Sequence, residues 1–309
     1  MLNSDGTIRW KGENHDSRSF NGSAVADIDM DGWLEIIAVN TAYANDGSVL
    51  WHNSSCKDGL TAAGNFDDDI FAEIVLINRK NGGRIYLLED DGTIKWGPVN
   101  FDGLGGPPVI ADIDNDGKPE IGTAGDNYYY AIEHDGSLKW KVSINDNNGI
   151  TGSSAFDFFN DGSSEILFSD QNNFFIFDGI DGSIRCQIPV ESATLLEMPV
   201  VADVDFDNSA EIIIPANTVY VGGEKGLIVL GDADNGWPGT GKVWNQHSYH
   251  ITNIGEDGQI PQNEPANHTV FNNYRENMSI PQKKGCYDIT ASYLRSASSD
   301  CADSVTLVV

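Results

Sequence analysis

Cysteine is scarce in this sequence, with four residues among 309 and none in a CxxC pair. That spacing argues against a zinc ribbon, a thioredoxin-like redox site and a disulfide-dense scaffold. Cys286 and Cys301 enclose a loop of about 15 residues, and either a disulfide or two free thiols fits this spacing. Cys56 and Cys186 fall in different repeats, and Cys186 takes the place that a Trp holds in the other hairpins, so we expect Cys186 to pack in the core.

Positive charge is also scarce. The chain has 18 Lys and Arg against 47 Asp and Glu, which gives a formal net charge of -29. No surface can then carry a basic footprint for a phosphate backbone, so nucleic acid and anionic membranes are poor partners. Such acidity opposes the compact state unless cations neutralise it, and metal ions are the first candidates.

Long apolar runs are missing as well. No stretch of 18 apolar residues occurs, so we expect no membrane insertion. The sequence begins MLNSDGTIRWKGEN, which lacks the basic and then apolar pattern of a secretory signal.

Two short motifs recur along the chain at a spacing of roughly 45 residues, which is typical of repeat folds. The first motif contains an acidic loop and reads AVADIDMDGWLEIIAV (24–39), AAGNFDDDIFAEIVLI (62–77), VIADIDNDGKPEIGTA (109–124), SAFDFFNDGSSEILFS (154–169) and VVADVDFDNSAEIIIP (200–215). The second motif contains an Asp-Gly pair and reads SDGTIRW (4–10), NDGSVLW (45–51), DDGTIKW (90–96), HDGSLKW (134–140) and IDGSIRC (180–186).

Each repeat predicts four short antiparallel strands. The Asp-Gly pair favours a two-residue hairpin turn in which both residues have positive φ. Four strands per repeat without helical periodicity predict an all-β fold, a β-propeller of four-stranded blades. A β-solenoid is the alternative, but its coils are usually shorter and seldom carry a hairpin in each repeat.

Five blades carry the acidic motif, and we expect six or seven in total. Residues 1–10 resemble the closing strand of an earlier blade, and 245–280 could complete one more. We therefore assign 1–280 to a propeller truncated at its N-terminus. In 281–309 the alternation of DITASYL and SVTLVV predicts strands of a different module.

The acidic loop has the spacing Asp-x-Asp-x-Asp-Gly-x-x-Glu. Calcium takes six to eight oxygen ligands, and side chains at loop positions 1, 3, 5 and 9 with a backbone carbonyl at position 7 can converge on one ion. An EF-hand would place its Glu at position 12 and continue into a helix. Here the Glu stands at position 9 and leads into a predicted strand, so the EF-hand interpretation fails.

The five loops differ in completeness. Three sets are complete, with position 7 included: Asp27, Asp29, Asp31, Trp33 and Glu35; Asp112, Asp114, Asp116, Lys118 and Glu120; Asp203, Asp205, Asp207, Ser209 and Glu211. Two sets are weaker: Asn65, Asp67, Asp69 and Glu73, with Ile70 at the turn; Asp157, Asp161 and Glu165, with Phe159 replacing the second ligand. We expect three to five Ca²⁺ ions per chain. Solvated Asp-Gly turns are the alternative, but five copies in register favour the metal.

The repeat closely resembles the FG-GAP/VCBS repeats of integrin-α-like propellers. It shares with them a strand of small residues, the loop ADxDxDG, and then xxE followed by β-branched residues. The resemblance implies calcium in the five loops. The tail DITASYLRSASSDCADSVTLVV resembles the opening of a CARDB-like immunoglobulin-fold adhesion module. Extracellular calcium modules bind with Kd of about 10⁻⁴–10⁻³ M, so we expect a secreted or cell-surface protein.

These features indicate a non-catalytic, calcium-stabilised module for adhesion or ligand binding, with an extracellular protein or glycan as ligand and further domains in the same polypeptide. The alternative is a lectin, or the scaffold of a polysaccharide lyase or hydrolase. Neither GxSxG nor HExxH occurs. His247 and His250 have HxxH spacing without a third zinc ligand nearby. Trp244, Tyr249 and Tyr274 could form an aromatic platform for sugars, although core packing explains them better.

Overall fold

The structure, a computed structural model, describes residues 1–12, 22–57, 59–79, 82–146, 148–217, 226–281 and 291–294. Its strands form five four-stranded sheets, each antiparallel and ordered as in the chain. The first ten strands are β1 (Ala24–Ala26), β2 (Glu35–Ala38), β3 (Thr41–Tyr43), β4 (Val49–His52), β5 (Gly59–Gly64), β6 (Glu73–Asn78), β7 (Gly83–Leu88), β8 (Ile94–Phe101), β9 (Val109–Ala111) and β10 (Glu120–Ala124). The others are β11 (Tyr128–Ile132), β12 (Leu138–Ser143), β13 (Ser153–Phe156), β14 (Glu165–Ser169), β15 (Asn173–Phe177), β16 (Ile184–Pro189), β17 (Val200–Ala202), β18 (Glu211–Ala216), β19 (Gly226–Asp232) and β20 (Ala291–Leu294).

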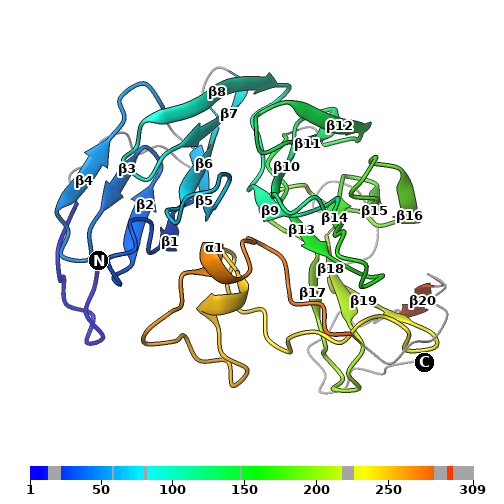
Figure 1. The fold of residues 1–309 in the computed structure, drawn as a ribbon. Helices are drawn as coiled ribbons and strands as arrows, with labels where there is room; N and C mark the ends of the chain where they lie inside the picture. The colour runs from blue at the N-terminus through cyan, green and yellow to red at the C-terminus, as the bar shows by residue number, and fades with distance from the viewer. Residues whose placement is uncertain are drawn as a thin grey trace.

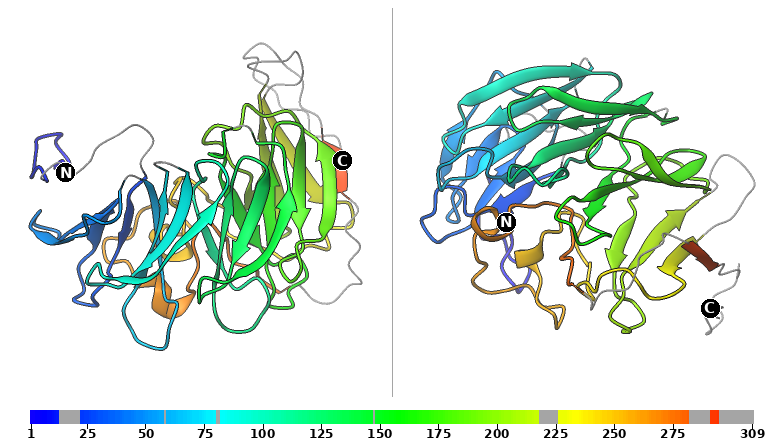
Figure 2. Two further views of the ribbon diagram at one scale, coloured as in Figure 1. Left: turned by 90° about the horizontal axis from the view of Figure 1, so that it is seen from above. Right: turned by 45° about the vertical axis from the view of Figure 1, so that its right-hand side comes forward.

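The five sheets are the blades of a propeller-like arc, as Figure 1 shows from blue to yellow-green. The prediction of an all-β fold with four-stranded blades is confirmed. In the second blade, β5 and β6 are buried along their whole length, whereas the outermost strand β8 is mostly exposed or half-buried. Neighbouring blades lie face to face (Figure 2), and the apolar side chains of their inner strands form the core between them. No helix in the described part of the chain is long and apolar enough to cross a membrane.

The hairpins between the third and fourth strands are not the predicted two-residue turns. In the first blade, the N–H of Ala44 donates to the Ser48 carbonyl at 2.9 Å and that of Gly47 to the Ala44 carbonyl at 2.9 Å. Within this loop only Gly47 has a positive φ, and the register shifts between Ala42 and Tyr43. This is a three-residue loop, a type I turn closed by a glycine bulge, so only one residue leaves the right-handed region.

Tryptophan side chains link each hairpin to the next. Four indole N–H groups donate to carbonyls in the hairpin of the following blade, at 2.6–3.1 Å: Trp10 to Asn45, Trp51 to Asp90, Trp96 to His134, and Trp140 to Gly179. Each ring also covers the glycine of that hairpin. Trp10, in the first residues of the chain, therefore makes the contact expected of the outer hairpin of a preceding blade.

Residues 245–280 do not form the further blade that we considered. They contain only a 3₁₀ turn, η1 (Ile251–Asn253), and one helical turn, α1 (Asn267–Val270). The segment runs along the inner ends of the blades on the open side of the arc (orange in Figure 1). Tyr274 pairs with Ile110 of β9, and the backbone beyond it reaches β13 and the loop after β19 through isolated bridges.

Arg275 anchors this segment. Its guanidinium is buried and donates to the carbonyls of Pro108 and of His247, the latter at 3.1 Å. The side chain of Asn272 bonds both the N–H and the carbonyl of Asn65, each at 2.7 Å. Residues 245–280, the closing segment, thus close the arc by polar contacts to backbone groups that the inner strand ends leave unpaired.

The predicted second module begins at residue 281. Within 281–309 the structure describes residue 281 and the stretch Ala291–Leu294. That stretch is β20, which pairs with β19 as the fourth strand of the fifth blade. Cys286 and Cys301, with the disulfide considered for them, lie outside the described residues. The domain boundary itself stays a prediction.

Candidate metal centres in the acidic loops

All five acidic loops join the first strand of a blade to the second. In each loop the Glu at position 9 opens the second strand and accepts, through Oε2, the N–H of the residue at position 2. These pairs, at 2.7–3.1 Å, are Ile28 with Glu35, Phe66 with Glu73, Ile113 with Glu120, Phe158 with Glu165, and Val204 with Glu211. One carboxylate oxygen thus fixes the side chain, and in Glu73, Glu120 and Glu211 the carboxylate also lies close to the loop aspartates.

The Asp at position 1 is held in a similar way in four loops. Its Oδ2 accepts the N–H of position 6: Asp27 from Gly32, Asp112 from Gly117, Asp157 from Gly162, and Asp203 from Asn208. The residues at positions 4 and 6 of these loops have positive φ. In the second loop neither Asp68 nor Ile70 has a positive φ, and the amide of Asn65 instead donates to the Asp69 carbonyl at 2.7 Å.

Four of the five loops bring their carboxylates together. Carboxylate oxygens lie within 4.8 Å of one another in four groups: Asp27, Asp29 and Asp31; Asp67, Asp69 and Glu73; Asp112, Asp114 and Glu120; Asp203, Asp205 and Glu211. The fourth loop, with Phe159 in place of an Asp, forms no such group among the described residues. The position-7 residues Trp33, Lys118 and Ser209 donate their N–H to the position-5 carboxylates.

Three loops also contain a buried carboxylate oxygen without any hydrogen-bond partner. These atoms are Oδ1 of Asp27, Oε1 of Glu120 and Oδ1 of Asp203, in side chains that are 8%, 1% and 1% exposed. A buried carboxylate oxygen without a partner is costly. The three loops are those with a complete ligand set, so the donor chemistry and the geometry both fit a hard cation such as Ca²⁺.

The glutamates titrate abnormally for the same reason. Burial, reinforced by neighbouring carboxylates, raises the pKa of Glu35, Glu73 and Glu211 to about 7. It raises the pKa of Glu165 to about 8 and that of Glu120 to about 9. Each of these carboxylates is therefore expensive to keep charged unless a cation lies beside it.

Two lysines that the ligand spacing did not single out reach the acidic loops with their side chains, Lys95 from β8 and Lys139 from β12. Lys95 Nζ lies 2.5 Å from Asp67 Oδ2, 3.8 Å from Glu73 Oε1 and 3.0 Å from Glu89 Oε1. Lys139 pairs with Asp114, and at 2.9 Å with Glu133 Oε1. A signal was present in the sequence, because both lysines stand directly before the Trp of the second repeated motif.

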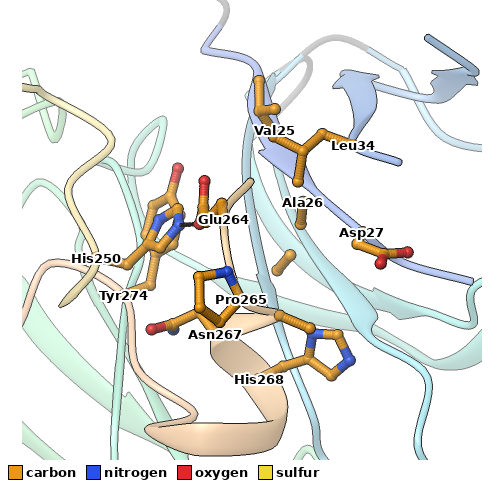
Figure 3. Close-up of a pocket in the computed structure, with 12 residues that line it drawn as sticks. Val25, Ala26, Asp27, Leu34, His250, Glu264, Pro265, Asn267, His268 and Tyr274 are labelled. Atoms are coloured by element: carbon orange, nitrogen blue, oxygen red, sulfur yellow. Dashed lines mark hydrogen bonds and ion pairs between the residues drawn. The ribbon is translucent and has the colours of Figure 1, made fainter. Parts of the chain in front are cut away.

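The two histidines with HxxH spacing point to different partners. His250 pairs with Glu264 and stacks on Tyr274, beside a cavity of about 10 Å³ that Asp27 also lines (Figure 3). That volume is enough for about one water molecule. His247 instead contacts the Leu196 carbonyl at 3.3 Å. The pair therefore does not converge on one ligand.

A larger cavity, of about 520 Å³, lies between the fifth blade and the closing segment. Asp203 of the fifth acidic loop lines it together with Lys242, Tyr249, Glu256 and Asn277. Cavities of this size are common for small-molecule ligands. Tyr249 itself is buried and stacks on Trp244 with centroids 4.1 Å apart, so the aromatic platform considered from the sequence packs internally.

No family model matches the chain, and no curated protein matches it. Solved structures do resemble it. The Vibrio cholerae biofilm matrix protein Bap1 superposes with a TM-score of 0.74 at 18% identity, over 84% of this chain and 71% of Bap1. A Bacillus licheniformis rhamnogalacturonan lyase, PL11, has a TM-score of 0.44 at 22% identity, over 64% of this chain and 34% of its own. The first likeness supports the propeller-like fold. The resemblance to FG-GAP/VCBS repeats and to a CARDB-like module stays a prediction.

Proposed function

We propose that this chain is a calcium-stabilised extracellular β-propeller, a non-catalytic module through which a larger secreted or surface protein adheres or binds a ligand. The observation that carries the calcium is the set of unpartnered buried oxygens on Asp27, Glu120 and Asp203. A calcium ion would bind through these oxygens and the neighbouring carboxylates and would neutralise them. The likeness to a biofilm matrix protein supports the extracellular setting.

The calcium would act on stability first. At 2 mM Ca²⁺ and a Kd of about 10⁻⁴ M, each site stabilises the folded state by about 1.8 kcal/mol. Two or three such sites give about 4–5 kcal/mol. In a chain of this size, 1 kcal/mol corresponds to roughly 2 °C in Tm, so we expect a rise of about 8–10 °C.

Thermal unfolding in EDTA and in 2 mM Ca²⁺, with calorimetric counting of bound ions, tests this proposal. Glu35→Gln should raise Tm in EDTA, because it removes a buried charge, and should reduce the rise that calcium causes. Asp135→Asn is the matched control, since Asp135 also accepts a backbone N–H, at 2.9 Å from Ser137, but lies in a hairpin away from the loops. If calcium neither binds nor shifts Tm, the acidic loops are only turns and the extracellular assignment loses its basis.

The large cavity favours a glycan as a second candidate ligand. Its charged side chains, Asp203, Lys242 and Glu256, offer both donors and acceptors for hydroxyl groups. Binding on a glycan array without turnover, lost in Lys242→Ala but kept in Lys141→Ala, would support a lectin. Release of unsaturated or shortened products from a polysaccharide would instead indicate a lyase or hydrolase. If no glycan binds, both sugar hypotheses fail and a protein ligand remains.

A further inference from the structure

The residue before the Trp or Cys of the second motif differs from blade to blade. It is Leu50, Lys95, Lys139 and Arg185 in the first four blades. This position lies on or beside the outermost strand, which passes next to the acidic loop of the same blade. Its side chain therefore decides whether the loop receives a cation from the protein itself.

In the second and third blades that cation is present. Lys95 and Lys139 each pair with the Asp at loop position 3, namely Asp67 and Asp114. Each ammonium also has a second carboxylate outside the loop, Glu89 or Glu133. The side chain of Lys139 is only 9% exposed, so its charge is buried among these oxygens.

The first blade lacks both parts of this arrangement. Leu50 replaces the lysine and is 44% exposed, and Ala44 stands where the other blades have Glu89 or Glu133. Among the described residues no cationic side chain pairs with Asp27, Asp29, Asp31 or Glu35. The fifth loop is likewise without an ion pair in the described part of the chain. Its Asp207 accepts from two neutral donors, the backbone N–H of Ser209 and the side-chain amide of Asn235.

The fourth blade has lost the loop carboxylate with which the basic side chain would pair. Phe159 occupies position 3, and the guanidinium of Arg185 lies over its ring, 5.6 Å from the centroid. Arg185 pairs with Asp178, which stands where the other blades have Glu89 or Glu133. The basic side chain thus keeps its outer carboxylate and loses its ion pair with the loop.

We propose that Lys95 and Lys139 are tethered counter-ions that compete with calcium for the position-3 aspartates, so that the first and fifth loops are the high-affinity sites of the chain. This inference rests on the proposed calcium binding and changes its distribution. Lys95 lies near two ligands of its loop, Asp67 and Glu73, and largely replaces the metal there. Lys139 leaves Glu120 Oε1 unpartnered, so the third loop still binds calcium, but more weakly than its complete ligand set indicates.

Calcium titrations of Lys139→Met and Lys95→Met test the inference, with Lys141→Met as the matched control. Lys141 lies two residues beyond Lys139 on β12 and contacts the Tyr128 ring instead of a loop. A unit positive charge a few ångströms from a divalent ion opposes its binding strongly, so we expect the affinity of one site to rise at least about tenfold in Lys139→Met. Both variants should also have a lower Tm than Lys141→Met in EDTA, and calcium should restore it.

The reverse experiment uses the first blade. Leu50→Lys combined with Ala44→Glu recreates the arrangement of the second and third blades at an exposed position, and we expect it to weaken one high-affinity site about tenfold or more. Terbium luminescence can report that site, because Trp33 lies in the loop and is 64% exposed. The counter-ion inference is wrong if the wild type binds calcium while the lysine variants match Lys141→Met in both affinity and Tm. Absence of calcium binding by the wild type would instead overturn the proposed function.

Discussion

The contact between Trp51 and Gly92 allows a quantitative test of how neighbouring blades are held together. The indole donates to the Asp90 carbonyl at 2.6 Å, and a Cβ built at Gly92 would lie 2.5 Å from the ring. Gly92 also has φ +79°. Gly92→Ala therefore combines backbone strain of about 1 kcal/mol with steric overlap of about 1–3 kcal/mol. Trp51→Ala should cost about 2 kcal/mol, less than a fully buried Trp, because the ring is half-buried.

The double variant separates the two causes. Once the ring is gone, Gly92→Ala retains only its backbone strain, so the two free-energy changes should fall short of additivity by about 1–3 kcal/mol. Denaturant unfolding in saturating calcium measures this coupling. Gly258→Ala is the control, because Gly258 has φ +77° in a similar Asp-Gly turn and its nearest neighbour, Val243, lies at 3.9 Å. Additivity of Trp51→Ala and Gly92→Ala within about 0.4 kcal/mol would refute the packing role of the ring.

The loops and the closing segment give three further predictions. The pKa of Glu35 rises from 4.5 to about 7 on folding, so between pH 5 and pH 8 the calcium-free folded state binds more protons than the unfolded state. The Tm of the calcium-free protein should therefore fall as the pH rises from 5 to 8, and bound calcium should remove that fall. Chelation should accelerate amide hydrogen exchange at β1–β2 and β17–β18 more than at β5–β12, and uniform acceleration would contradict the counter-ion role of the lysines. Arg275→Met leaves the Pro108 and His247 carbonyls without a donor and should cost roughly 2 kcal/mol in urea unfolding, whereas an unchanged midpoint would show that water replaces the guanidinium.

The repeated motifs made the blades and loops predictable, because the same local contacts recur in each copy. Every position-9 Glu accepts the N–H of position 2 in its own loop, a separation of 7 residues. The hairpin geometry was missed, since Asp-Gly is compatible with two turn types and only the backbone shows that Gly47 alone has a positive φ.

Residues 245–280 could not be placed from the sequence for a different reason. They have no strand periodicity, and their contacts are distant: Asn272 and Asn65 are 207 residues apart, and Arg275 and Pro108 are 167 apart. Lys95 and Lys139 were visible in the sequence, because both stand directly before the Trp of the second repeated motif. Their pairing with the loop carboxylates could not be predicted, because it depends on how the outermost strand passes the acidic loop in the folded blade.

The divergence among the five loops reflects one constraint, which is that the buried Glu at position 9 must be compensated if it is to stay charged. The fourth loop reduces the demand by replacing a carboxylate with Phe159. The second and third loops supply a cation from Lys95 and Lys139. The first and fifth loops keep their carboxylates and have no such cation among the described residues, so under the proposed function they depend on a metal. These two loops belong to the blades at the two ends of the arc (Figure 1). Calcium would therefore stabilise the ends of the propeller, while the middle blades are compensated internally.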